Sequence, residues 1–186
     1  EFETHYQRFL MPTVRGSDKG SKKRYAGVVS RGGEDRLVFK GLENVRTDWT
    51  RLARDFQLEL YRRVFMDEPF EDYVRQVTAA LRAGERDADL VYRKRLRRRL
   101  DDYQRNVPPH VQAARLCEQR GLPVPRRGSW VEYVITTAGA EPAQAPLAPL
   151  DYEQYVERQL QPVADGILCF LGTSYHELVD SQIGLF

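Results

Sequence analysis

The chain has 186 residues, of which 41% are hydrophobic and 30% are charged, and its formal net charge is +2. This size suits one domain, or one domain with part of another, and the apolar share is large enough for a buried core. No apolar run approaches the roughly 20 residues of a membrane-spanning helix, and we recognise no signal peptide. We therefore expect a cytoplasmic protein without a membrane partner. Because the chain opens on Glu1 without an initiator methionine, we also expect a longer parent protein.

The small net charge hides two basic segments. Residues 15–40 and residues 92–105 each carry a net charge of +5, so the rest of the chain is acidic. Charge concentrated in this way indicates a directed site for an anion rather than a generally adhesive surface.

The cysteines and histidines do not suggest a metal site. Cys117 and Cys169 have no second cysteine or histidine at metal-ligand spacing, so we interpret both as reduced thiols in the core. The three histidines are scattered along the chain, which argues against a metal site built on them.

The first 48 residues are predicted to contain a β-hairpin. Residues 1–14 are expected to be extended or irregular, and residues 15–21 hold the turn-forming residues of a loop. Two β-rich segments, 25–30 and 36–40, then flank a turn that contains two glycines. This arrangement is typical of a hairpin.

Helices are predicted to follow. Apolar residues recur at helical spacing from Trp49 to Val64, which predicts an amphipathic helix with Thr47 or Asp48 as its N-cap. A second helix is expected after Pro69 and should end at Gly84. Residues 90–100 fit either a strand or the beginning of a helix.

The second half of the chain mixes helices with a small β element. We expect a helix from Pro108 to about Arg120 and a short strand at 130–135. The Ala-, Pro- and Gly-rich residues 138–149 are expected to form an exposed loop. Residues 151–182 have a helical pattern with interruptions near Pro162 and Gly172. The predicted class is therefore α+β, a short hairpin followed by a mainly helical domain with a small β element, divided near Trp49.

One basic motif leads directly into the predicted hairpin. It consists of Lys22, Lys23, Arg24 and Tyr25, and strand alternation would turn Lys23 and Tyr25 to one face. A solvated basic turn is the plain interpretation. A cation and a ring on one face of a strand pair also suit contact with a sugar–phosphate backbone or a minor groove.

Several motifs together resemble bacterial family-B DNA polymerases. The basic motif lies in Gly-Ser-Lys-Lys-Arg-Tyr-Ala-Gly and is followed by Phe-Lys-Gly-Leu-Glu at 39–43, Val-Arg at 45–46 and Asp-Trp at 48–49. The basic residues 92–105, the segment 109–115 and the helical segment 151–162 continue the resemblance. It implies that residues 1–48 are the end of the palm and that residues 49–186 are the thumb.

The resemblance also implies roles for individual side chains. Lys22, Lys23 and Tyr25 should lie against the primer–template duplex, where a lysine in the minor groove meets acceptors on every base pair. Lys40 and Arg46 should hold the primer strand, while Glu43 and Asp48 should orient Arg46 or cap the helix. The thumb cations should contact duplex phosphates. The complete expected DNA-binding set is Lys22, Lys23, Arg24, Tyr25, Lys40, Arg46, Lys94, Arg95, Arg97 and Arg98.

The resemblance places catalysis outside this chain. The acidic pairs Asp87 with Asp89 and Asp101 with Asp102 could suggest a two-metal site, since nucleotidyl transfer needs paired carboxylates for Mg²⁺. In the family, however, the metal-binding aspartates precede the basic motif. We therefore expect Mg²⁺ in the parent DNA-directed DNA polymerase, and no cofactor, metal site or catalytic residue in this fragment, which should be inactive alone.

The last five residues, 182–186, are expected to bind the sliding clamp. Gln182, Ile183, Leu185 and Phe186 are similar to the peptide with which bacterial polymerases dock on that ring. Leu185 and Phe186 would enter an apolar pocket while Gln182 fixes the register. The plain alternative is a frayed terminus whose apolar residues make the last contact of a helix.

Two other classes of function remain open from the residues alone. One is a stand-alone, non-enzymatic module that binds RNA or DNA. The other is an interaction scaffold whose basic segments meet an acidic protein.

Overall fold

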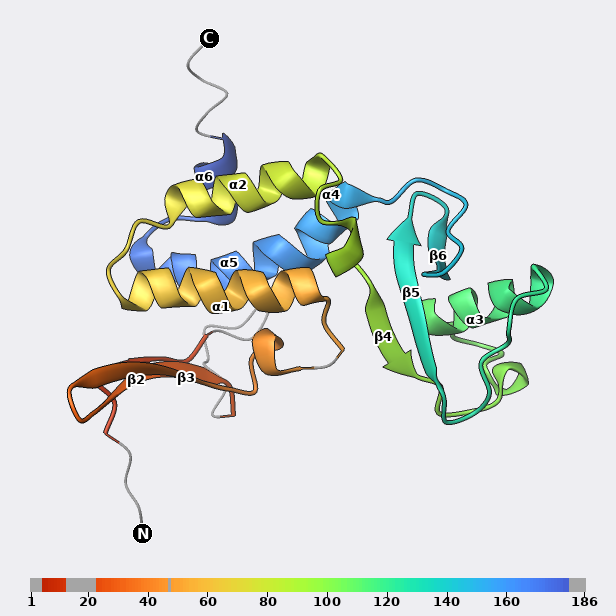
Figure 1. Ribbon diagram of the computed structural model, residues 1–186, viewed down its shortest axis with the longest axis horizontal. Coiled ribbons are helices and arrows are strands. Elements are labelled where there is room, and N and C mark those ends of the chain that lie inside the picture. Colours follow the sequence, from red (N-terminus) through yellow and green to blue (C-terminus); the bar gives the residue numbers. More distant parts are fainter. Residues whose placement is uncertain (1–4, 13–22, 47, 181–186) are drawn as a thin grey trace.

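The computed structural model describes residues 5–12, 23–46 and 48–180. Two three-stranded antiparallel sheets, ordered β1–β2–β3 and β4–β5–β6, lie towards opposite ends of the molecule, and helices cover the first of them (Figure 1). The predicted α+β class is confirmed. The strands are β1 (Arg8–Leu10), β2 (Tyr25–Arg31), β3 (Glu34–Lys40), β4 (Tyr92–Arg95), β5 (Trp130–Thr136) and β6 (Gly139–Pro142). The α-helices are α1 (Arg51–Phe65), α2 (Glu71–Arg82), α3 (Pro109–Gln119), α4 (Tyr152–Tyr155), α5 (Gln161–Leu168) and α6 (Tyr175–Asp180).

The predicted hairpin is present as β2 and β3. Gly32 and Gly33 form its turn with φ values of 63° and 85°, a backbone that glycine adopts without a steric penalty. The segment expected to be extended or irregular contributes a third strand, β1, which pairs with β2. A Cβ on Gly27 of β2 would lie 2.5 Å from the ring of Tyr6, so this glycine allows the chain before β1 to approach β2.

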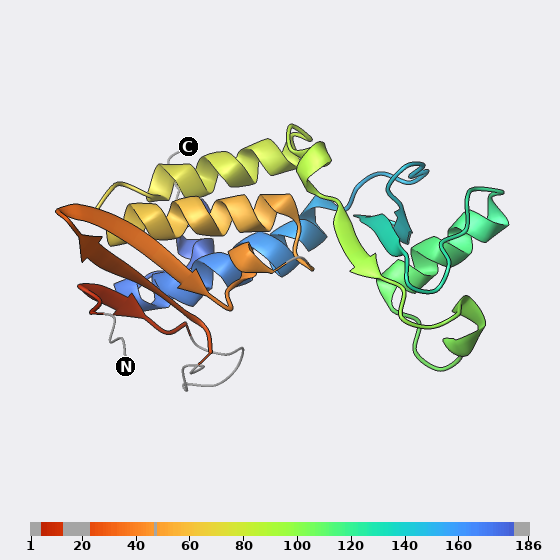
Figure 2. The ribbon, with the colours of Figure 1, turned by 60° about the horizontal axis from the view of Figure 1, so that its bottom comes forward.

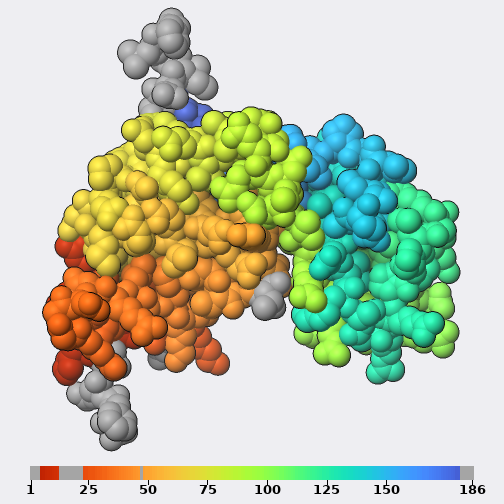
Figure 3. Space-filling model, in the orientation of Figure 1, coloured from red at the N-terminus to blue at the C-terminus, as the bar shows by residue number. Residues whose placement is uncertain are grey.

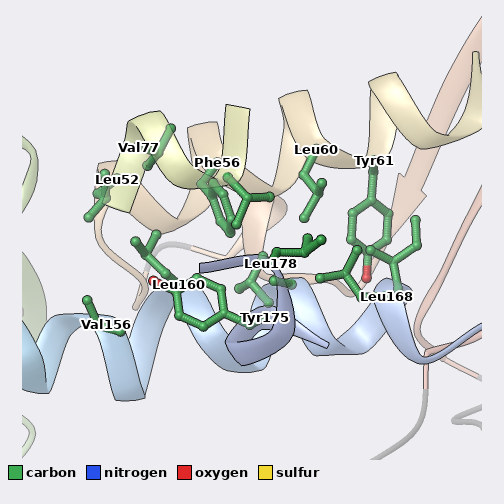
Figure 4. Packing of buried hydrophobic residues seen from close by; sticks show 14 of the residues in the cluster. Leu52, Phe56, Leu60, Tyr61, Val77, Val156, Leu160, Leu168, Tyr175 and Leu178 are labelled. Carbon is green, nitrogen blue, oxygen red and sulfur yellow. The ribbon is translucent and has the colours of Figure 1, made fainter. Parts of the chain in front are cut away.

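One hydrophobic core joins the first sheet to the helices. Leu52, Phe56 and Leu60 of α1 are almost fully buried, and they pack towards the C-terminal helices as Figure 4 shows. Ala26 and Val28 of β2 belong to the same core, so the first sheet packs against the helical layer (Figure 2). The division into a palm part and a thumb part stays a prediction, and the packing is continuous across it.

The N-cap of α1 differs from the expected one. Thr50 caps the helix by accepting a hydrogen bond from the backbone N–H of Ala53 at 3.2 Å. Asp48 lies two residues too early and pairs with Arg46, while Thr47 lies outside the described residues. The hydroxyl of Thr50 also donates to Oε1 of the buried Gln159 at 2.6 Å, which ties the start of α1 to the C-terminal helices.

The interruption expected near Pro162 is a change of helix type and not a break in the helix. Residues Val156–Leu160 form one turn of π-helix between α4 and α5, and Pro162 follows at the start of α5. A π turn inserts one residue relative to the α-helix, and such a turn can absorb a proline that lacks the N–H for the regular ladder. The interruption predicted near Gly172 is present, with this residue in the left-handed region at φ 72°.

A second, smaller core lies under the other sheet. Leu96, Val111 and Val131 are among its buried members, and α3 contributes residues to it from one side. The ambiguous segment 90–100 contains strand β4, an edge strand paired only with β5. Tyr92 and Ile135 pack against both cores and so connect them.

The segment expected to be an exposed loop is partly a buried strand. Within residues 138–149, β6 pairs with β5, and Glu141 is only 3% exposed. Its carboxylate accepts hydrogen bonds from the backbone N–H groups of Leu147 and Ala148, and it pairs with Arg120 at 2.8 Å. A buried carboxylate with donors on several sides fixes the path of this otherwise irregular segment.

Two other expectations concern the cysteines and a membrane-spanning helix. Cys117 is a buried free thiol as expected, whereas Cys169 is exposed because it begins the final turn before Gly172, away from the core. Among the residues described, no helix combines the length and the apolar character needed to cross a membrane.

Candidate nucleic-acid interface

A cation-lined hollow of about 570 Å³ lies along β4. Arg93, Lys94, Arg95, Arg97 and Arg127 contribute positive charge to its wall. Its other lining residues are Asp48, Leu96, Gly128 and Trp130. In the space-filling view the molecule is notched between the part built on the first sheet and the part built on β4 to β6 (Figure 3). Five of the nine described residues that line the hollow are therefore cationic.

Strand geometry explains why β4 presents so much charge. Only its β5 side is paired, where Lys94 faces Val131 and Arg95 faces Trp130 in the antiparallel register. The other edge is not covered by a strand among the described residues, so long basic side chains reach solvent there. Charged residues are well suited to such an edge because they discourage pairing with another chain.

Asp48 joins the two parts of the molecule at this hollow. Its carboxylate accepts two hydrogen bonds from the guanidinium of Arg46, at 3.0 and 2.8 Å, and lies 3.8 Å from Nζ of Lys94. The hydrogen bonds from Arg46 lower the pKa of Asp48 below its ordinary value despite partial burial. Two predicted DNA-binding residues, Arg46 and Lys94, are thereby brought to one carboxylate.

The other cations of the hollow differ in their partners. Nε of Arg93 lies 3.6 Å from the carboxylate of Glu132 in an exposed ion pair. Arg95 donates from Nε to the backbone oxygen of Gly128 at 2.7 Å, which fixes its side chain without cancelling its charge. Arg97 and Arg127 are exposed, and among the described residues neither forms an ion pair. The hollow therefore keeps a net positive potential that attracts phosphate groups. Arg98 is also exposed but is not part of the wall.

The predicted site on the hairpin forms a separate cluster. Tyr25 and Lys40 face each other across β2 and β3, and Nζ of Lys40 lies 5.7 Å from the centre of the Tyr25 ring. The rings of Tyr6 and Phe9 complete an aromatic cluster with Tyr25. Lys23 is exposed but precedes the strand, so the alternation expected of a strand does not extend to it.

Arg24 is turned towards the protein. It forms an ion pair with Glu43, a residue that is only 7% exposed, and Glu43 accepts another hydrogen bond from Nε2 of Gln57 at 2.7 Å. Glu43 therefore pairs with Arg24 and not with Arg46, because Asp48 already engages Arg46. Gly41 permits the close approach of these segments, since a Cβ there would lie 2.3 Å from the carbonyl oxygen of Lys23.

The structure thus brings some predicted residues together and leaves others apart. Lys94, Arg95 and Arg97 line one hollow, and Arg46 reaches it through Asp48. The hairpin residues do not line it. The remaining predicted residues lie outside the described part of the chain: Lys22, Gln182, Ile183, Leu185 and Phe186.

Besides Leu96 and Gly128, four residues of the hollow were not in the predicted DNA-binding set. Arg93 belongs to the basic segment 92–105 but was not in that set. Arg127 and Trp130 lie more than 30 positions after β4 in the sequence, and Asp48 was expected only to orient Arg46 or to cap a helix. The dipeptide of Arg126 and Arg127, followed by a glycine and shortly by a tryptophan, is the signal in the sequence that points to them. Cations next to an aromatic residue are typical of single-strand and backbone recognition.

The described residues offer no metal centre. Across residues 5–12, 23–46 and 48–180, no group of three His, Cys, Asp or Glu side chains could hold a metal ion. Asp87 instead accepts a hydrogen bond from the hydroxyl of Tyr152 at 3.0 Å, and Asp89 pairs with Arg86 at 2.8 Å. We assign no catalytic step to these carboxylates.

Comparison with known proteins gives consistent matches along the chain. A family model described as DNA polymerase family B matches residues 1–168. DNA polymerase II of Escherichia coli (strain K12) is 58% identical over all of this chain and 24% of that protein. DNA polymerase 2 of Aeropyrum pernix is 35% identical over 85% of this chain and 20% of that protein. The solved structure of the family B DNA polymerase from Pyrobaculum calidifontis aligns with a TM-score of 0.68 at 28% identity, covering 94% of this chain and 23% of that one. The chain therefore spans about a quarter of the length of these relatives.

Proposed function

Because this chain belongs to DNA polymerase family B, we propose that it is the part of such an enzyme that holds primer–template duplex DNA. The observation that carries the proposal is the hollow along β4, where cations from residues far apart in sequence surround one open space. Duplex DNA carries one negative charge per about 1.7 Å of its axis, so a concentrated set of exposed cations supplies sequence-independent affinity.

The cations take different parts in this proposal. Lys94, Arg95, Arg97 and Arg98 contact phosphates of the duplex from the thumb. Arg46 acts beside them, held in place by Asp48. Positive charge on an uncovered strand edge suits a backbone that is recognised by charge and not by sequence.

The hairpin cluster contacts the same duplex near the primer end. Lys23, Tyr25 and Lys40 are the contacting residues, with Lys22 preceding them in the sequence. Arg24 does not contact the duplex directly in this proposal, because its guanidinium forms an ion pair with Glu43; it holds the start of the hairpin in place instead. A lysine in the minor groove senses the acceptors common to all base pairs.

A titration by fluorescence anisotropy tests this function. The full 186-residue chain should prefer primer–template DNA over single-stranded DNA and duplex RNA, and its affinity should fall with salt at a slope of about −0.9 per phosphate contacted. Arg97→Gln combined with Arg127→Gln should weaken binding and reduce the slope by about 2. Arg82→Gln removes a cation from α2 and serves as the matched control.

The outcome separates the rival functions. Equal affinity for the three polymers would favour a general nucleic-acid-binding module, and no binding to any of them would favour a protein-interaction scaffold. An Arg82→Gln variant that loses as much affinity as the double variant would contradict the assignment of the site to β4.

We propose that nucleotide addition requires the rest of the parent polymerase, with Mg²⁺ held by residues outside this chain. A mixture of the chain, primer–template, nucleotides and Mg²⁺ should therefore give no primer extension on a sequencing gel. Extension that survives repurification of the chain would overturn this part of the proposal.

The C-terminal residues 182–186 are proposed to bind the sliding clamp. Burial of Leu185 and Phe186 would contribute roughly 3–6 kcal/mol before ordering costs, which is weak alone and useful when the same molecule already holds DNA. Deletion of both residues should abolish clamp binding in a pull-down while DNA affinity stays unchanged. Unaltered clamp binding by the truncated chain would refute the assignment.

A further inference from the structure

Trp130 stands exposed at the rim of the basic hollow. It opens β5 directly opposite Arg95, and 45% of its surface remains accessible. Strand alternation explains the exposure, because Val131 and Tyr133 take the inward positions and are buried in the second core. A large aromatic ring at a position that solvent reaches is not required for packing of that core.

Cations surround the ring of Trp130. The guanidinium carbon of Arg93 lies 4.7 Å from the ring centre, a cation–π contact that holds both side chains in place. Arg95 lies across the strand pair, and Arg97 and Arg127 complete the same wall. Cationic groups therefore line the same hollow as an aromatic surface.

The space beside Trp130 is open on more than one side. The ring borders the 570 Å³ hollow and also a neighbouring hollow of about 460 Å³, which Cys117, Val124 and Gln144 help to line. Concave sites of about 300–1,000 Å³ accommodate ligand-sized molecules. Such a volume accommodates one nucleotide, while a duplex would contact the cations at the rim of the hollow.

We propose that Trp130 stacks an unpaired nucleobase while the surrounding arginines hold the adjoining phosphates. A base inside a duplex has both faces covered by its neighbours, so only an unpaired base presents a face to the ring. Phosphate contacts alone would not need an aromatic group. This inference rests on the proposed function, and it adds that one part of the thumb recognises single-stranded DNA next to the duplex.

The test compares three DNAs that carry equal numbers of phosphates. They are a blunt duplex, a duplex with an unpaired overhang, and the same overhang duplex with abasic sites in place of the overhanging bases. The chain has two tryptophans, so Trp49→Phe leaves Trp130 as the only fluorescent indole. Its emission should be quenched by the overhang duplex and much less by the other two.

Affinities measured by anisotropy provide the second readout. The intact overhang should bind about 5- to 150-fold more tightly than the abasic one, as expected for one stacked base. Trp130→Leu should abolish this preference, Trp130→Phe should retain part of it, and Leu147→Ala, at an exposed position near β6, should leave it unchanged.

The outcomes separate this inference from the proposed function. Similar quenching by all three DNAs, or an equal loss of affinity for all three in Trp130→Leu, would overturn base stacking while duplex binding stands. Failure of every DNA to bind the unmodified chain at low salt would overturn the proposed function together with the inference.

Discussion

Positive charge is used differently in the two parts of the molecule. On the helical side, arginines are matched with carboxylates: Arg62 contacts both Glu59 and Glu68, and Arg24 pairs with Glu43. On the side built on β4 to β6, Arg120 and Arg93 also meet carboxylates, those of Glu141 and Glu132. Arg97 and Arg127, however, border an open hollow, where Asp48 is the only acidic lining residue described. The number of cations in a segment therefore overstates the positive charge that is left for a ligand. The relevant quantity for binding an anion is the number of cationic side chains that form no ion pair with Asp or Glu.

The largest effects are expected from substitutions in the two hydrophobic cores, which test whether the two parts of the molecule unfold separately. Leu60→Ala in the first core and Leu96→Ala in the second should each cost about 2–5 kcal/mol of unfolding free energy, because each removes a fully buried side chain and leaves a cavity. In a Trp130→Phe background, urea unfolding followed by the emission of Trp49, which packs against the first core, should be shifted more by Leu60→Ala. In a Trp49→Phe background, unfolding followed by the emission of Trp130 should be shifted more by Leu96→Ala. Identical shifts at both reporters would show that the two parts unfold as one unit.

Removal of a matched carboxylate should have the next largest effect. Glu43→Gln leaves the guanidinium of Arg24 without its counter-charge and should cost about 1–3 kcal/mol. Glu34→Gln, at an exposed position beside the hairpin turn, is the control and should change little. Denaturant unfolding measures both variants. A Glu43→Gln variant as stable as the control would mean that Arg24 is already well solvated.

The buried Glu141 should give a smaller, pH-dependent effect. Burial alone would raise its pKa, but hydrogen bonds from Leu147, Arg120, Thr136 and Ala148 outweigh burial and lower the pKa below 4.5. Its charged form therefore stabilises the folded state above about pH 4.5, and this contribution is lost as the pH falls through the lowered folded-state pKa.

Glu141→Gln tests that expectation. The variant should be less stable than the unmodified chain by about 1–2 kcal/mol at neutral pH, and the difference should shrink in acid. Thermal unfolding between pH 3 and pH 7 measures the difference, since 1 kcal/mol moves the midpoint by about 2–4 °C in a chain of this size. A constant difference across this range would contradict the ionised role.

The smallest effect on stability is expected from substitution of an arginine that forms no ion pair. Arg97→Gln should change the unfolding free energy by no more than about 0.5 kcal/mol, because its side chain is exposed and forms no ion pair among the described residues. The same variant should lower DNA affinity and reduce the salt slope by about 1. A stable variant with unchanged DNA affinity would contradict the proposal that arginines without an acidic partner bind phosphate.

Regular periodicity made much of the fold predictable. The apolar stripe of α1 and the paired glycines of the hairpin are local signals that tertiary contacts reinforce. Strand β6 was missed because alanine, glycine and proline give no alternation there, and burial of Glu141 with Arg120 fixes it instead. A contact between residues 21 positions apart is not visible in a local pattern.

The site was predictable only in part for the same reason. Lys94, Arg95 and Arg97 belong to one basic run, which is visible in the sequence as a continuous cluster of charge. Arg127 and Trp130 join them only through strand pairing, which no local pattern specifies. The DNA-binding and clamp-binding roles themselves stay predictions.

The π turn at Val156–Leu160 holds one residue more than a regular α-helix would at this place. Each residue of a helix rotates the chain by about 100° around the helix axis. Loss of one residue there would convert the turn to regular α-helix and rotate the preceding helix, α4, relative to α5. Gln159 would then no longer meet Thr50 at the start of α1. Insertions and deletions accepted during the divergence of the family are therefore expected in its surface connections, while this extra residue should be inherited as a fixed spacer.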